Sequence, residues 1–163
     1  MITSRHARSA IRVERLQATS LFSNCTKGEL RQIASITTTK DVAAGSVLAY
    51  QGTAGREFFI VMEGSATATR NGQVLARLGP GSFFGELALL DGGRRTATVV
   101  ADTAMALLVL TRSEFTALQY TAPSVARKIL IELGSRMRHT YELHDGPSEA
   151  GTAAVPQTQT ASL

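Results

Sequence analysis

A carboxylate and an arginine stand near each other in a stretch that is otherwise small and apolar. Glu86 follows Gly85, and Arg95 comes after one apolar run and a glycine turn. An arginine can hold a phosphate through two parallel hydrogen bonds. A carboxylate beside that phosphate would repel it, so Glu86 needs a neutral donor, and a ribose hydroxyl is the obvious one. Together the two side chains describe the contacts of a small nucleotide, although the same pair could form a surface ion pair worth under about 1 kcal/mol.

The backbone of this stretch also favours an anion. Gly85 lets a ligand approach the main chain closely, and Ala88 leaves the surface unobstructed. We predict a short helix over 85–90, because the run is apolar and Asp91-Gly92-Gly93 ends it. The first N–H groups of a helix have no internal partners and attract negative charge.

The elements that must position this stretch are short strands. From about Thr37 to Leu110, β-branched and small apolar residues form runs broken by glycine about every eight to twelve positions, which predicts a small all-β barrel or sandwich. Asn71-Gly72 is typical of a two-residue hairpin turn, which needs positive φ at both positions. The predicted strands cover 38–42, 47–51, 57–62, 66–70, 74–78, 98–101 and 104–110, and the third, nearly all apolar, is expected to be central.

Helices flank the predicted barrel. Before it we predict one helix over 5–17 and another over 26–36, the second with Thr26 as N-cap and Glu29 at the spacing of a capping box.

After the barrel, Thr111 or Ser113 can cap a helix over 114–120. Pro123 then suits the first turn of a longer helix that ends near residue 143.

The pattern predicts a single domain over 1–144. It consists of helices over 5–36, a barrel over 37–110 and C-terminal helices over 112–143. Residues 145–163 are mainly Gly, Pro, Ser, Thr, Ala and Gln, which predicts a disordered tail.

Composition excludes several classes of protein. The chain has 163 residues, 44% of them hydrophobic, which suits a globular domain. Cys25 is the only cysteine, so an intrachain disulfide framework and a cysteine-only metal site are excluded. No run is long enough for a membrane span, and the arginine-rich start is not typical of a secretory signal, so we expect a cytoplasmic protein.

The formal net charge of +4 raises the question of a nucleic-acid partner. The basic residues gather in the N-terminal arm, at Arg94-Arg95 and along the last helix, which is more typical of solvated helix faces. A helix-turn-helix unit needs two helices, and we expect no room for one after residue 143. Direct contact with nucleic acid is therefore not expected.

The stretch Phe84-Gly85-Glu86-Leu87-Ala88-Leu89, followed by Arg95-Thr96-Ala97, resembles the phosphate-binding cassette of cyclic nucleotide-binding domains. That family includes catabolite activator proteins, regulatory subunits of cyclic-nucleotide-dependent kinases and cyclic-nucleotide-gated channels. The glycine pattern of the barrel extends the resemblance over roughly residues 15–143. It implies a mainly β fold with flanking helices: an eight-stranded β-roll or jelly-roll barrel with N-terminal helices, a short phosphate-binding helix and C-terminal lid helices.

The resemblance also implies roles for individual residues. Arg95 would pair with the cyclic phosphate, and Glu86 would accept a hydrogen bond from the ribose 2′-hydroxyl. Thr96 could reach the base or the phosphate, whereas Arg94 has no implied role and is expected to face solvent. The full set of expected binding residues is Phe84, Gly85, Glu86, Leu87, Ala88, Arg95, Thr96 and Ala97, with backbone N–H groups near Leu87 and Ala88 completing the phosphate contacts.

The resemblance implies a sensor that binds cyclic AMP or cyclic GMP and relays a change through its terminal helices to an effector protein or a second copy. No metal or other cofactor is expected. The sensor half of a transcription regulator and a scaffold without ligand remain as alternatives. An enzyme is disfavoured because His6, His139 and His144 all lie outside the predicted barrel. The candidate lid contacts are Leu130, Leu133, Met137 and either Arg136 or Arg138, a stripe that could instead pack on the barrel or on a second copy.

Overall fold

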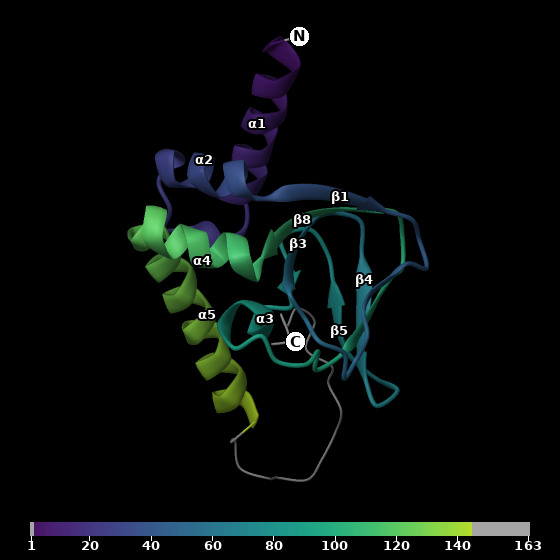
Figure 1. The fold of residues 1–163 in the computed structure, drawn as a ribbon. Coiled ribbons are helices and arrows are strands. Elements are labelled where there is room, and N and C mark those ends of the chain that lie inside the picture. The colour runs from purple at the N-terminus through teal and green to yellow at the C-terminus, as the bar shows by residue number, and fades with distance from the viewer. Residues whose placement is uncertain (1, 145–163) are drawn as a thin grey trace.

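The computed structural model describes residues 2–144, and the side chains of that range except those of 2–9, 88, 136 and 140–144. The predicted disordered tail, 145–163, lies outside the described residues. Helices α1 (Ile2–Gln17), η1 (Ser20–Phe22) and α2 (Lys27–Ile36) come before the strands, and α4 (Arg112–Thr121) and α5 (Pro123–His144) follow them (Figure 1).

Within residues 2–144, eight strands form two four-stranded antiparallel sheets, with the orders β1-β8-β3-β6 and β2-β7-β4-β5. This arrangement confirms the expected mainly β roll with flanking helices. The strands are β1 (Thr38–Val42), β2 (Val47–Ala49), β3 (Glu57–Glu63), β4 (Ala66–Arg70), β5 (Gln73–Leu78), β6 (Phe83–Phe84), β7 (Thr98–Ala101) and β8 (Met105–Thr111).

Local signals in the sequence predicted several elements correctly. Asn71 and Gly72 have φ of 51° and 78° in the turn that joins β4 to β5, as the hairpin prediction required. Thr26 caps α2 in a capping box with Glu29. Thr111, rather than Ser113, caps α4 in a second capping box, which lets the helix begin at residue 112 instead of 114.

Two details around the cassette differ from the sequence prediction. Phe83 and Phe84 form β6, which pairs with Phe59 and Ile60 of β3. With only two residues, β6 is too short to show an alternating pattern in the sequence. The short helix α3 (Leu87–Leu90) begins two residues later than expected, because Gly85 has a φ of +80° that no helix can contain.

Strand β3 lies between β8 and β6 and separates two apolar cores. Successive side chains of a strand point to opposite faces. Phe58 and Ile60 therefore join a core shared with the helices, while Phe59 and Val61 face the interior of the barrel, and all four are at most 1% exposed. The barrel core also contains the small residues Ala49, Ala66, Ala68, Ala76, Ala97 and Ala101.

The helical core joins the two ends of the described chain. It contains Leu16 of α1, Leu30 of α2, Phe115 of α4 and Val125 of α5, together with Phe58 from the sheet. In Figure 1 the helices pack at one side of the barrel, and α5 leads away from α4. The last helix is thus anchored on helices from the beginning of the chain.

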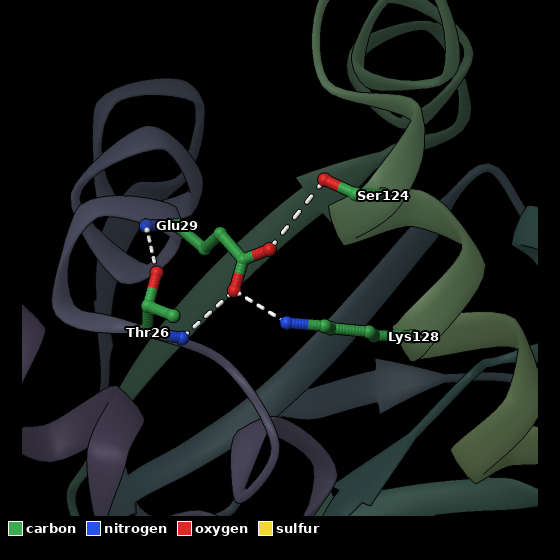
Figure 2. Close-up of polar contacts among 4 residues, drawn as sticks. All are labelled: Thr26, Glu29, Ser124 and Lys128. Carbon is green, nitrogen blue, oxygen red and sulfur yellow. Dashed lines mark hydrogen bonds and ion pairs between the residues drawn. The ribbon is translucent and has the colours of Figure 1, made fainter.

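One carboxylate adds a polar connection across this core (Figure 2). Glu29 of α2 accepts hydrogen bonds from Lys128 Nζ at 2.7 Å and from Ser124 Oγ at 3.5 Å, both on α5. The same carboxylate accepts from the backbone N–H of Thr26 at 2.8 Å. We call these four residues the Glu29 clamp.

The clamp stabilises the charged form of its carboxylate. The hydrogen bond from Lys128 lowers the pKa of Glu29 below its ordinary value of 4.5, and the backbone hydrogen bond from Thr26 acts in the same direction. A lowered pKa in the folded state means that the stabilisation is fully present above the ordinary value and is lost as the pH falls through the folded-state pKa.

We predict that Glu29→Gln lowers the free energy of unfolding by about 1 kcal/mol at neutral pH, because glutamine can keep the capping box but not the ion pair. Urea unfolding of the two proteins from pH 7 down to well below pH 4.5 checks this, and the difference should shrink toward acid pH. Lys128→Met should behave like Glu29→Gln. Arg127→Met removes the same charge from an exposed neighbouring position and should change little; an equal loss in that control would contradict the clamp.

Candidate functional site

The candidate site is the segment between β6 and β7, residues 84–97, which we call the cassette segment. Its two ends are anchored in the barrel core, where Phe84 is 1% and Ala97 2% exposed. The ring of Phe84 stacks on that of Phe59, with centroids 4.8 Å apart and planes 18° from parallel. The segment therefore leaves from the end of one sheet and returns to the other.

Gly85 allows two parts of the site to approach each other. Its φ of +80° disfavours any residue with a side chain. A Cβ added at this position would overlap Arg95 Nη1 and lie 2.8 Å from the carbonyl oxygen of Glu57. In the structure it is the guanidinium of Arg95 that approaches Gly85 closely, and the approach of a ligand stays a prediction.

Arg95 is a half-buried cation with an unused donor. Its Nη1 is buried and has no hydrogen-bond partner among the described residues. Burial lowers the pKa of Arg95, and the carboxylates of Glu57 and Glu86 partly offset this by favouring the charged form. Since arginine stays protonated in proteins, the unused N–H can donate to an anion that arrives from outside.

Glu86 is 1% exposed, so its carboxylate is not part of a solvated surface ion pair. It interacts electrostatically with Arg95, so the two predicted binding residues lie in the same site. A buried carboxylate of this kind is an acceptor in a position where a ligand hydroxyl could donate to it.

The remaining predicted binding residues are Thr96, Leu87 and Ala88. Thr96 Oγ1 is buried without a hydrogen-bond partner among the described residues, beside Arg95 in sequence. Leu87 is half-buried at the start of α3. The side chain of Ala88 lies outside the described ones. Because α3 is a single turn of four residues, its dipole is smaller than the sequence argument assumed.

Arg94 points away from this cluster. It is exposed, and its Nη1 donates to the carbonyl oxygen of Gly52 at 2.7 Å. The expectation that Arg94 faces solvent is confirmed, so two adjacent arginines have different environments.

The loop between β2 and β3 holds the backbone of Arg95, which the sequence analysis missed. The N–H of Arg95 donates to Thr53 O at 2.7 Å, and the N–H of Gly52 donates to Arg95 O at 2.8 Å. A third hydrogen bond, from Gly55 N–H to Gly93 O, measures 3.3 Å. In the sequence, Gly52 and Gly55 indicate an ordinary turn. Only the presence of two glycines within four residues hints at a close backbone contact.

A hollow of about 1270 Å³ opens beside Arg95. It lies among β2, the 53–57 loop and the start of α4, and includes Tyr50, Arg56 and Arg112 in its wall. Glu86 and Thr96 do not line it, so we locate the site by the buried polar atoms of the cassette segment and not by the hollow.

The candidate lid residues lie in different environments. Leu133 is 2% exposed within the helical core, and Leu130 is 36% exposed. Met137 is half-buried and Arg138 exposed, while the side chain of Arg136 is not described. Leu133 therefore packs in the helical core, as the alternative to a lid contact expected of this stripe, although its partners are mainly helices.

Other site types find no support in residues 2–144. No cluster of three metal-ligating side chains occurs among the described residues. His139 is exposed on α5, far along the chain from the barrel, and the side chains of His6 and His144 are not described. None of the described helices is long and apolar enough to cross a membrane.

Comparison with known proteins gives consistent matches. A cyclic nucleotide-gated potassium channel of Mesorhizobium japonicum is 37% identical over 71% of this chain and 33% of the channel. The cyclic AMP receptor protein of Thermus thermophilus is 39% identical over 58% of this chain and 46% of the receptor. The structure of the regulatory domain of Toxoplasma gondii PKA with cAMP superposes with a TM-score of 0.70 at 27% identity, covering 82% of this chain and 52% of that chain.

The chain spans about a third to a half of the length of these relatives. A family model described as the cyclic nucleotide-binding domain matches residues 39–120, which include most of the barrel, the whole cassette segment and most of α4. On this match the chain belongs to the cyclic nucleotide-binding domain family.

Proposed function

We propose that this chain binds cyclic AMP or cyclic GMP at the cassette segment and acts as a sensor module. The observation that carries this proposal is a pair of buried, unpartnered polar atoms, Arg95 Nη1 and Thr96 Oγ1, in adjacent residues. Buried polar groups without partners are rare in folded proteins and demand a reason. A bound nucleotide supplies that reason if its phosphate accepts from Arg95 and either its phosphate or its base contacts Thr96.

In the proposed complex, Arg95 donates to the cyclic phosphate while the buried Glu86 carboxylate accepts from the ribose 2′-hydroxyl. The two roles need opposite charges near each other, and the interaction of Arg95 with the buried Glu86 supports this arrangement. Gly85, Leu87 and the backbone at Ala88 complete the phosphate side, while Phe84 and Ala97 anchor the segment.

The proposed role is regulatory and involves no catalysis by the chain. The relatives are a gated channel, a receptor protein and a kinase regulatory domain. We propose a cytoplasmic module, residues 1–144, whose terminal helices carry the change to an effector protein or a second copy. A ligand shifts such an equilibrium only by its differential affinity for the two conformations.

Calorimetric titration of the full chain with cyclic AMP and cyclic GMP tests the proposal. Arg95→Ala should weaken binding by about ten- to a hundredfold, because one charge-assisted hydrogen bond is worth about 1.5–3 kcal/mol. Arg94→Ala is the matched control and should retain most of the affinity of the wild type, since its side chain is exposed and donates to a backbone oxygen, that of Gly52. In thermal unfolding, nucleotide at a hundred times its Kd should add about 2.7 kcal/mol of stability to the wild type.

The proposal fails if neither nucleotide binds or stabilises the wild type. Equal losses in Arg95→Ala and Arg94→Ala would show that the affinity comes from general positive charge, which would contradict the specific role of Arg95.

Thr96→Val tests the second unpartnered atom, because valine keeps the branched shape and removes the hydroxyl. We expect the affinity for at least one of the two nucleotides to fall about three- to tenfold, which corresponds to one neutral hydrogen bond. The ratio of the two Kd values before and after the change identifies what the hydroxyl contacts. A common loss indicates the phosphate, whereas a selective loss indicates the base. Unchanged affinity for both nucleotides would contradict any contact.

A further inference from the structure

The guanidinium of Arg95 lies against two residues that are outside the cassette segment. Gly55 belongs to the loop between β2 and β3, and Phe59 belongs to β3 itself. The Cζ atom of Arg95 is 5.6 Å from the centroid of the Phe59 ring. A Cβ added to Gly55 would lie 2.8 Å from Arg95 Nε, 2.9 Å from Cζ and 3.0 Å from Cδ.

Position 55 requires a glycine because a side chain would overlap Arg95, and not because of its backbone conformation. Its φ lies outside the left-handed region, unlike that of Gly52 in the same turn, which is +83°. An alanine at position 55 would thus meet no backbone strain. The three atoms nearest to its Cβ would all belong to the side chain of Arg95, at distances that a Cβ hardly tolerates, so Arg95 would have to move.

Phe59 provides a fixed surface for the guanidinium. The ring is 1% exposed and is held by its stacking on Phe84. A guanidinium within about 6 Å of an aromatic centroid is attracted by the ring electrons, and more strongly when partly desolvated. Rotation of the ring would disturb both the barrel core and the arginine.

The backbone contacts complete the restraint. The hydrogen bonds of Arg95 with Thr53 and Gly52 fix the main chain on the same loop that carries Gly55. The side chain therefore leaves a fixed backbone, passes the bare Cα of Gly55 and lies near the face of Phe59.

We propose that Gly55 and Phe59 are positioning residues for Arg95 and set the affinity for the phosphate without touching it. This inference rests on the proposed function and adds to it a determinant in the β2–β3 loop. Because a phosphate is best held by two parallel N–H groups in a plane, a displaced guanidinium loses both distance and direction.

Gly55→Ala in the full chain is the direct test. We expect its affinity for cyclic AMP and cyclic GMP to fall at least tenfold and toward that of Arg95→Ala. The double variant Gly55→Ala/Arg95→Ala should bind no more weakly than Arg95→Ala alone. Gly79→Ala is the matched control, because Gly79 also has an ordinary φ and an added Cβ there meets no atom within 4 Å. It should bind like the wild type.

Phe59→Leu tests the ring. We expect an affinity loss of about two- to fivefold from the missing cation–π attraction. Phe58→Leu removes the neighbouring ring, equally buried but facing the helical core, and controls for the loss of packing. A larger affinity loss in Phe59→Leu than in Phe58→Leu supports the positioning role, and equal losses contradict it.

A spectroscopic measurement separates this inference from the proposed function. In the nucleotide-free protein, the NMR signal of Arg95 Nε–H, identified by its absence in Arg95→Lys, should be shifted by the ring current of Phe59. It should move in Gly55→Ala and Phe59→Leu and stay in Gly79→Ala. If the wild type binds no nucleotide, the proposed function fails while this signal still tests the placement of Arg95. If nucleotide binds but Gly55→Ala leaves both affinity and signal unchanged, the positioning role is overturned and the proposed function stands.

Discussion

The site depends on keeping a guanidinium partly out of water with one of its donors unused. Desolvation opposes the charge on Arg95, while Glu57, Glu86 and the ring of Phe59 favour it. The neighbouring Arg94, by contrast, is exposed and donates to the carbonyl oxygen of Gly52. The backbone of Arg95 is hydrogen-bonded on both sides to the β2–β3 loop, and its side chain lies against Gly55 and Phe59. The protein thus holds the cation in an unfavourable environment, which the phosphate of the proposed complex would relieve.

The alternation along β3 links this environment to the helices. Phe59 faces the barrel and the arginine, while Phe58 and Ile60 face the helical core that holds α2 and α5. A shift of β3 that changes the barrel interior therefore also changes the surface on which the helices pack. Cores this densely packed move as units and not by small independent adjustments. Strands β6 and β8 also face both cores, with Phe83 and Leu108 in the helical core and Phe84 and Leu107 in the barrel core.

Sequence alone predicted the features that local chemistry determines. The capping box at Thr26, a cap at Thr111 or Ser113 and the turn at Asn71 depend on neighbours within three residues. The structure has the first and the turn, and it places the second cap at Thr111. Glu86 and Arg95 were found because their types are unusual in an apolar stretch. The role of Gly55 could not be predicted, because in the sequence a glycine that leaves room for a side chain far along the chain cannot be distinguished from a turn glycine. The two-residue strand β6 and the inward packing of Leu133 likewise depend on tertiary contacts.

The helical core also constrains the order of folding. Glu29 and Lys128 are 99 residues apart, and the apolar side chains around them come from the same two distant segments. During synthesis, α1 and α2 emerge first and expose Leu16, Leu30 and Ile33 until α5 has left the ribosome. Contacts of this range form slowly, because a long loop must close before they contribute. Until α5 is available, these apolar side chains depend on contacts among the N-terminal helices, beside exposed polar residues such as Lys27 and Arg31.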